Sequence, residues 1–132
     1  MIVVDASIVV DLLLDHETTA EPIWKRFRGA RGQLAAPHLI DAEVTQVLRR
    51  FVLQHKLEAG RAMQAIEDFL ALPITRYAHA PFLARAFALR DNVTAYDALY
   101  LVLAESLDAP LLTRDAALAH VPGHDAKVEI IA

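Results

Sequence analysis

The sequence of 132 residues contains no cysteine, which excludes disulfides and metal sites built on thiolates. It has only four glycines, and none of them begins a GxGxxG pattern or precedes a lysine, so the common phosphate-binding loops are absent. The longest uninterrupted apolar run, Ala98 to Ala104, is far shorter than the ~20 residues that span a membrane. Any metal in this chain would therefore have oxygen or imidazole ligands.

The composition and the first residues indicate a cytoplasmic protein of one domain. Hydrophobic residues make up 55% of the chain, and 24 alanines and 19 leucines against nine aromatic residues predict an aliphatic core rich in helix. The segment Met1 to Asp5 has no basic group before its apolar stretch and reaches an acid at once, unlike a signal peptide. We expect a single domain over residues 1–132, soluble and without membrane contact.

Short apolar strands alternate with helical segments along the chain. The first strand is a run of β-branched residues, Ile2 to Val4, and the segment 95–107 is apolar on nearly all sides, as a buried helix is. We expect strands at 2–5, 34–36, 74–75, 110–113 and 128–131, with Pro37 ending the second. We expect helices at 6–14, 17–28, 39–55, 58–72, 81–89, 95–107 and 115–119, with a break at 15–16. This alternation predicts an α/β fold with a short, mostly parallel central sheet flanked by helices.

Acidic residues stand where such a fold binds ligands, outside the carboxyl ends of its strands. Asp5 ends the first predicted strand, and Asp115 follows the fourth by two residues. Each of them also has a structural interpretation as the N-cap of the next helix, and Asp97 forms a capping-box pattern with Thr94. Glu43 lies beside the apolar stripe of its helix, where a carboxylate needs a partner, a metal or a wet edge.

The four acids together indicate a metal site more strongly than any one of them does. Two follow strands, one lies early in a long helix and one lies in the first turn of a buried helix, so all four can face one rim of the sheet. Converging carboxylates repel one another, which raises their pKa values unless a cation neutralises them. Mg²⁺ takes oxygen ligands and commonly sits on one or two carboxylates together with water and a substrate phosphate.

Four motifs in order carry a resemblance to a known family. They are Ile2-Val3-Val4-Asp5-Ala6-Ser7, then Glu43, then Tyr96-Asp97-Ala98-Leu99-Tyr100-Leu101, and last Leu111-Leu112-Thr113-Arg114-Asp115. With these motifs the chain resembles a PIN domain, specifically the VapC-type toxin ribonucleases of bacterial type II toxin–antitoxin pairs. The resemblance implies that Asp5, Glu43, Asp97 and Asp115 form an acidic site for Mg²⁺ or Mn²⁺, with Asp5 and Asp97 as principal ligands. Ser7 and Thr113 match positions that support the site through their hydroxyls.

The implied reaction is metal-assisted hydrolysis of RNA phosphodiester bonds, with Asp115 or Glu43 orienting the attacking water. The net charge of −4 argues against a generic nucleic-acid binder, but without the four site acids the other thirteen acids balance thirteen bases. Two groups of basic residues could then contact RNA phosphates: Lys25, Arg26, Arg28 and Arg31, and Arg49 with Arg50. Each group also has a structural interpretation as a solvated helix face. Recognition by RNA shape or a single-stranded loop fits this balance better than tight generic binding.

The expected partner is a cognate VapB-type antitoxin, and the protein is expected to be a homodimer. Two apolar clusters, one over residues 8–14 with Leu13 and one with Trp24 and Phe27, exceed what a single sheet-facing stripe uses. Both clusters are either part of the core or part of a groove for the antitoxin. The resemblance favours the groove, because such antitoxins lay an amphipathic segment over the toxin. The rival interpretation is a non-catalytic α/β module, receiver-like or for protein interaction, in which the acids are only helix caps.

Overall fold

The computed structural model describes residues 1–14, 17–31 and 33–131, so the predicted break at 15–16 lies outside the described residues. Its five strands form one sheet in the order β3-β2-β1-β4-β5, and all four strand pairs are parallel. The strands are β1 (Ile2–Val4), β2 (Leu34–Pro37), β3 (Ile74–Tyr77), β4 (Leu111–Thr113) and β5 (Val128–Ile130). The prediction of an α/β fold with a mostly parallel sheet is confirmed.

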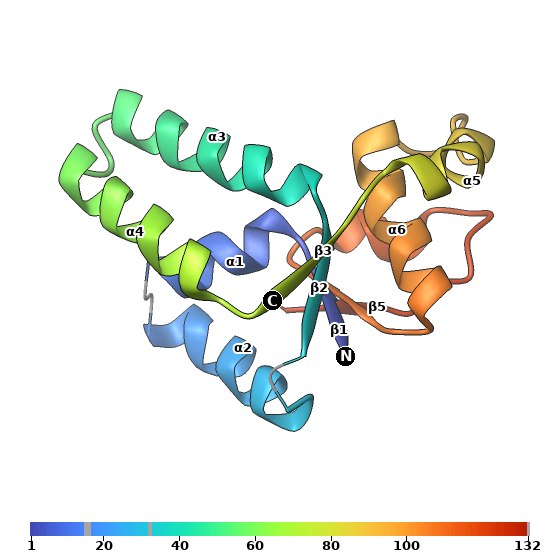
Figure 1. Cartoon of the computed structure of the whole chain (residues 1–132), viewed down its shortest axis with the longest axis horizontal. Helices are drawn as coiled ribbons and strands as arrows, with labels where there is room; N and C mark the ends of the chain where they lie inside the picture. The colour runs from blue at the N-terminus through green and yellow to red at the C-terminus, as the bar shows by residue number, and fades with distance from the viewer. Residues whose placement is uncertain (15–16, 32, 132) are drawn as a thin grey trace.

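Helices cover both faces of this sheet (Figure 1). On one side lie α1 (Ala6–Leu13), α2 (Glu17–Gly29), α3 (Leu39–Leu53) and α4 (Ala59–Ala71), and α1 contacts the other three. On the other side lie α5 (Leu83–Ala88) and α6 (Ala95–Leu107), and α6 contacts β1, β2 and β4. Two 3-10 helices, η1 (Ala80–Phe82) and η2 (Ala116–His120), complete the fold.

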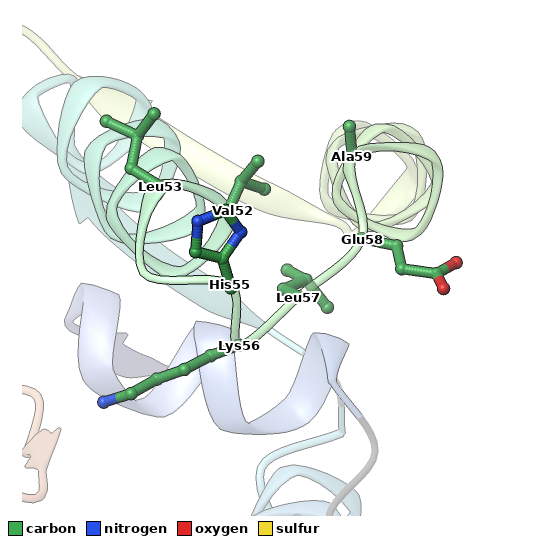
Figure 2. Close-up of a pocket in the computed structure, with 7 residues that line it drawn as sticks. All are labelled: Val52, Leu53, His55, Lys56, Leu57, Glu58 and Ala59. Carbon is green, nitrogen blue, oxygen red and sulfur yellow. The ribbon is translucent and has the colours of Figure 1, made fainter.

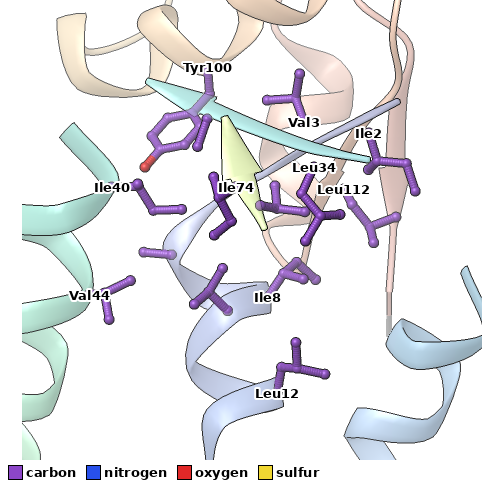
Figure 3. Packing of buried hydrophobic residues seen from close by; sticks show 14 of the residues in the cluster. Ile2, Val3, Ile8, Leu12, Leu34, Ile40, Val44, Ile74, Tyr100 and Leu112 are labelled. Carbon is purple, nitrogen blue, oxygen red and sulfur yellow. The ribbon is translucent and has the colours of Figure 1, made fainter. Parts of the chain in front are cut away.

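The core lies along β1 and extends to both helical layers. Every residue of β1, β2 and β4 is buried, because central parallel strands are covered on both faces. Figure 3 shows Ile8 of α1 and Ile40 and Val44 of α3 on one side of the strands. Tyr100 comes from α6, which lies on the other side of the sheet. Helix α6 is buried continuously from Ala98 to Ala104, which is why its sequence is apolar all round.

Several predicted boundaries were wrong. The second strand was predicted one residue too short, since Pro37 is the last residue of β2, and β3 continues to Tyr77, because Pro37 and Tyr77 are paired in register. The helix predicted over 81–89 starts as the 3-10 helix η1, with proline in its first turn, before α5 begins at Leu83. The short helix predicted at 115–119 is the 3-10 helix η2. Helix α3 ends at Leu53, where the chain turns through His55 with a positive φ of 57°.

No helix in the described part of the chain is both long enough and apolar enough to cross a membrane.

Candidate active site

The carboxyl ends of β1 and β4 lie side by side, and the candidate site is built on them. The sheet runs from β1 outward to β2 and β3 in one direction and to β4 and β5 in the other. The point where the order reverses lies between β1 and β4, and open α/β sheets bind ligands at such a point. Asp5 follows β1, and Thr113 ends the neighbouring strand β4.

Hydrogen bonds fix the Asp5 carboxylate on both of its oxygens. The Ser7 hydroxyl donates to Oδ1 at 2.6 Å, the Ile8 N–H donates to the same oxygen at 3.2 Å, and the Thr113 hydroxyl donates to Oδ2. Burial raises the pKa of Asp5 above its ordinary value and outweighs these hydrogen bonds, which lower it. Asp5 is the N-cap of α1 as well, so its structural role and its place in the site coexist.

Thr113 and Ser7 connect Asp5 to the segment that carries Asp115. The Thr113 hydroxyl accepts a hydrogen bond from the Asp115 N–H at 3.1 Å, and the Ser7 hydroxyl accepts one from the Arg114 N–H at 3.2 Å. The Asp115 carboxylate accepts from the Ala117 N–H at 3.0 Å and caps η2, while the residue itself is exposed. The two hydroxyls therefore hold the β4–η2 turn against the beginning of α1.

Glu43 comes to the site from the first turns of α3. Its Oε1 accepts a hydrogen bond from the Tyr100 hydroxyl at 2.7 Å, which links α3 to α6. Burial raises the pKa of Glu43, the hydrogen bond from Tyr100 lowers it, and the charges of Asp97 and Asp5 raise it further. The backbone N–H of Leu39 donates to His79 Nε2 at 3.0 Å, so a side chain from beyond β3 fixes the start of the helix that carries Glu43.

Asp97 lies in the first turn of α6 and is half-buried. Thr94 caps this helix, since its hydroxyl oxygen accepts from the Asp97 N–H at 3.2 Å. Burial raises the pKa of Asp97, and the charges of Asp115 and Asp5 raise it further. The Asp97 carboxylate therefore lies within reach of the charges of two other acids, while the Thr94 side chain lowers its pKa.

The charges of neighbouring acids raise the pKa values of two of the four carboxylates, Glu43 and Asp97, as expected of groups near one rim of the sheet. Within the ranges that the structure describes, however, no three acidic or histidine side chains already form a closed set of metal ligands. One or two carboxylates with water suffice for Mg²⁺. The four acids fit such an ion, because every ligand atom they offer is a hard carboxylate oxygen. Three of them have pKa values raised by burial, and in two of these the charge of other acids adds to the rise.

The residues predicted to contact partners are divided between core and surface. Leu13 and Phe27 are buried at 6% and 4% exposure, whereas Trp24 is 39% exposed with its ring edge-on to that of Phe27. Trp24 lines two hollows of about 340 Å³ each, one together with Leu13 and the other together with Phe27. Of these three residues, Trp24 alone offers a large free surface.

The basic residues are divided as well. Arg26 is paired with Glu129 and Arg28 with Glu21, whereas Arg31, Arg49 and Arg50 are exposed, as is Lys25. Arg50 lines a hollow beside Glu43, which gives it a place close to the site.

Tyr100, Arg114 and Asp11 were not predicted as functional residues, although Tyr100 and Arg114 stand in two of the four motifs. A tyrosine on a helix that is apolar all round is a usable signal, because a buried hydroxyl requires a partner. No comparable signal exists for the ion pair of Arg114 with Asp11, whose Nε and Oδ2 atoms are 3.0 Å apart. This pair joins the segment after β4 to α1, next to the bond between Arg114 and Ser7.

A large hollow of about 740 Å³ lies away from the carboxylates, at the turn between α3 and α4. Figure 2 shows its lining from Val52 to Ala59, with Lys56 and Glu58 extending in opposite directions. Its residues come from a single turn and include none of the four acids, so it does not belong to the candidate active site.

Comparisons with known proteins find relatives over almost the whole chain. The profile of the PIN domain matches residues 2–124. Ribonuclease VapC1 of Mycobacterium tuberculosis is 41% identical over 130 residues, which cover 98% of this chain and 96% of that protein. Ribonuclease VapC12 of the same organism is 37% identical over 132 residues, the full length of both.

Two solved structures share the fold at low sequence identity. The structure of VapBC2 from Rickettsia felis, bound to a DNA fragment from its promoter, matches with a TM-score of 0.71 at 14% identity over 98% of both chains. That of Mycobacterium tuberculosis VapC20, described as a sarcin-ricin loop cleaving toxin, matches with a TM-score of 0.70 at 14% identity, over 96% of this chain and 99% of that one.

The chain therefore belongs to the PIN-domain family. Within that family its curated relatives are VapC ribonucleases that match it over almost its whole length, and the resemblance predicted from the four motifs is confirmed.

Proposed function

We propose that this protein is a divalent-metal-dependent endoribonuclease that acts as the toxin of a type II toxin–antitoxin pair. The observation that carries the proposal is a set of four acids around the point between β1 and β4 where the strand order reverses: the charge of Asp5 acts on Glu43 and Asp97, and that of Asp115 acts on Asp97. Three of them have pKa values raised by burial and two of these also by neighbouring acids. The ribonuclease names of relatives at 37% and 41% identity support the substrate class.

Each side chain of the site has a task in this reaction. Asp5 and Asp97 would hold Mg²⁺ or Mn²⁺, with Ser7 and Thr113 fixing the orientation of Asp5 through its hydrogen bonds. Tyr100 holds one oxygen of Glu43, which leaves the other oxygen free to orient a water molecule, and exposed Asp115 is the second candidate for that task. The cation, when bound, supplies Lewis-acid activation and charge neutralisation at the phosphate.

The decisive experiment compares Asp97→Asn with Asp125→Asn. Asparagine keeps the size of aspartate while removing its charge, and exposed Asp125 lies before β5 at the opposite edge of the parallel sheet. We expect Asp97→Asn to lose RNA cleavage by more than about 100-fold, with a melting temperature in EDTA no lower than that of the wild type, and Asp125→Asn to cleave like the wild type. Cleavage that persists in Asp97→Asn, or in wild type with excess EDTA, would contradict the proposal.

The proposed partner is a VapB-type antitoxin, because structural neighbours of this chain include a VapBC complex and a toxin–antitoxin complex from Klebsiella pneumoniae. An amphipathic segment of the antitoxin would cover Trp24 and the hollows beside it, and a basic side chain would face the carboxylates. Trp24→Ala should therefore weaken inhibition of cleavage by a co-expressed antitoxin. If the complex cleaves RNA as fast as the free protein does, this account of the partner is wrong.

The homodimer and the cytoplasmic location stay predictions. An RNA substrate and an intracellular antitoxin both require action in the cytoplasm, which cell fractionation tests. Sedimentation of the purified protein tests the homodimer.

A further inference from the structure

A groove of about 450 Å³ begins at the candidate site and runs along α3. Glu43 lies at its beginning, Gln46 and Arg50 follow on the same helix, and Tyr96 from the start of α6 forms its other wall. Leu39 and Val47, also on α3, add apolar surface to its lining. Its volume is within the roughly 300–1,000 Å³ of sites that hold one small ligand.

The spacing along α3 separates the two charged ends of this groove. Glu43 and Arg50 are seven residues apart, which places them on one face of the helix about 10.5 Å from each other along its axis. In the part of the chain that the structure describes, Arg50 takes part in no ion pair, although five other arginines do. A guanidinium without an ion-pair partner in the described ranges therefore lies about two helical turns along α3 from Glu43.

Tyr96 presents its ring to solvent directly beside the acidic site. It is 63% exposed and precedes Asp97, whereas α6 fills its core positions with the residues from Ala98 to Ala104. The hydrophobic core therefore makes little use of this aromatic ring. An exposed ring and a cation in one groove, together with apolar surface, offer a stacking surface for a base and a contact for its phosphate.

We propose that this groove binds one unpaired nucleotide of the RNA next to the scissile phosphate, with its base on the Tyr96 ring and a phosphate on Arg50. The proposal rests on the proposed ribonuclease function and assigns a nucleotide-binding subsite beside the acids to Tyr96, Gln46 and Arg50. A base held in a duplex has both faces covered by its neighbours and does not reach the ring. The Gln46 amide is placed to hydrogen-bond the base edge or the ribose.

Binding of a fluorescent single-stranded RNA oligonucleotide to the non-cleaving Asp97→Asn protein, at fixed salt with Mg²⁺, tests the groove without requiring catalysis. On this background Tyr96→Ala should weaken binding about 5- to 150-fold, the range measured for loss of one stacked base, whereas Tyr96→Phe should bind nearly normally. Phe87→Ala is the matched control, because Phe87 is equally exposed at 67% but lies on α5 outside the groove. Thermal unfolding confirms that each variant is folded.

Arg50→Gln and Lys127→Gln form a second pair, since both side chains are exposed cations and only Arg50 lines the groove, whereas Lys127 lies before β5 at the opposite edge of the sheet. Loss of one phosphate contact should reduce the slope of log affinity against log salt by about 0.7 in Arg50→Gln and leave it unchanged in Lys127→Gln. In the otherwise wild-type enzyme, Tyr96→Ala should raise KM for a single-stranded substrate more than it lowers kcat. The same sequence held in a duplex should be cleaved poorly by every form.

Failure of this inference is distinguishable from failure of the proposed function. If the wild type cleaves RNA, and Tyr96→Ala and Arg50→Gln bind and cleave single strands like their controls, the groove assignment is overturned while the nuclease stands. If these variants instead lose association with a second copy of the chain or with the antitoxin, with RNA affinity unchanged, the groove is a protein interface and the proposal is also overturned. Selective loss of RNA affinity in both variants on the Asp97→Asn background supports the groove, whatever the rate of cleavage by the wild type.

Discussion

Thr113 is the one polar side chain that is completely buried among the residues the structure describes. Its hydroxyl donates to Asp5 and accepts from the Asp115 N–H, so both of its hydrogen-bonding functions are used within the candidate site. A buried hydroxyl is retained only where its bonds offset the cost of desolvation. At Thr113 the cost of desolvation is offset by the hydrogen bonds to the Asp5 carboxylate and from the Asp115 backbone N–H.

Replacement of Thr113 by valine tests this arrangement at nearly constant volume. It leaves Asp5 Oδ2 and the Asp115 N–H without their partner, so the free energy of unfolding should fall by about 1–3 kcal/mol. The pKa of Asp5 should rise further, because the hydroxyl bond lowers it. Chemical denaturation and NMR titration measure the two effects.

The control for this substitution is Thr45→Val. Thr45 is exposed and donates to the Asp41 carbonyl within α3, so its loss should change the free energy of unfolding by less than about 0.5 kcal/mol. Equal effects of the two substitutions would show that Thr113 has no special role in the site.

At the scale of elements, α2 is attached to the rest of the fold in two physically different ways. Ile23 and Phe27 are buried at 0% and 4% exposure, and Arg26 makes a two-pronged ion pair with Glu129 of β5 at 2.8 and 2.9 Å. The pair raises the pKa of Arg26 and lowers that of Glu129. Its side chains remain 35% and 40% exposed, so water screens most of the attraction.

Packing should therefore stabilise α2 much more than the ion pair does. We expect Phe27→Ala to lower the free energy of unfolding by about 3–5 kcal/mol, and Arg26→Gln to lower it by less than about 1 kcal/mol. Urea denaturation of the two variants measures the difference. A larger loss in Arg26→Gln than in Phe27→Ala would reverse this ranking of the two contacts.

For the whole molecule, the acidic site makes stability depend on pH and on divalent cations. The pKa values of Asp5, Glu43 and Asp97 are raised on folding, so the folded protein binds protons more readily than the unfolded chain. This contribution to stability is present below the ordinary values of 3.8 and 4.5 and is lost as the pH rises through the raised values. Glu129, whose pKa is lowered, acts in the opposite sense below 4.5.

In EDTA, the melting temperature should therefore decrease as the pH rises from about 4.5 toward neutrality. Saturating Mg²⁺ or Mn²⁺ should raise it at neutral pH, since a ligand that binds only the folded state stabilises that state. Asp97→Asn should show a flatter pH dependence and a smaller response to the cation. Calorimetric scans across this range are the measurement, and a wild-type melting temperature that increases with pH in EDTA would contradict the sign derived from the pKa shifts.

The sequence alone determined the elements and the positions of the acids, because both depend on local patterns. A β-branched run followed by an acid predicts β1 and Asp5, and an apolar segment behind a Thr94 cap predicts α6 and Asp97. Pro37 and Tyr77 were misplaced because strand ends depend on pairing between β2 and β3, which no local pattern records.

The tertiary structure alone decided which groups meet. Thr113 and Asp5 are 108 residues apart, and Tyr100 and Glu43 are 57 apart, so their hydrogen bonds follow from strand register and helix packing. Likewise, Phe27 is buried and Trp24 is exposed in the folded protein, although both belong to one apolar cluster of the sequence. Hydropathy ranks residues by type, whereas the face that a helix buries is decided by the elements that pack against it.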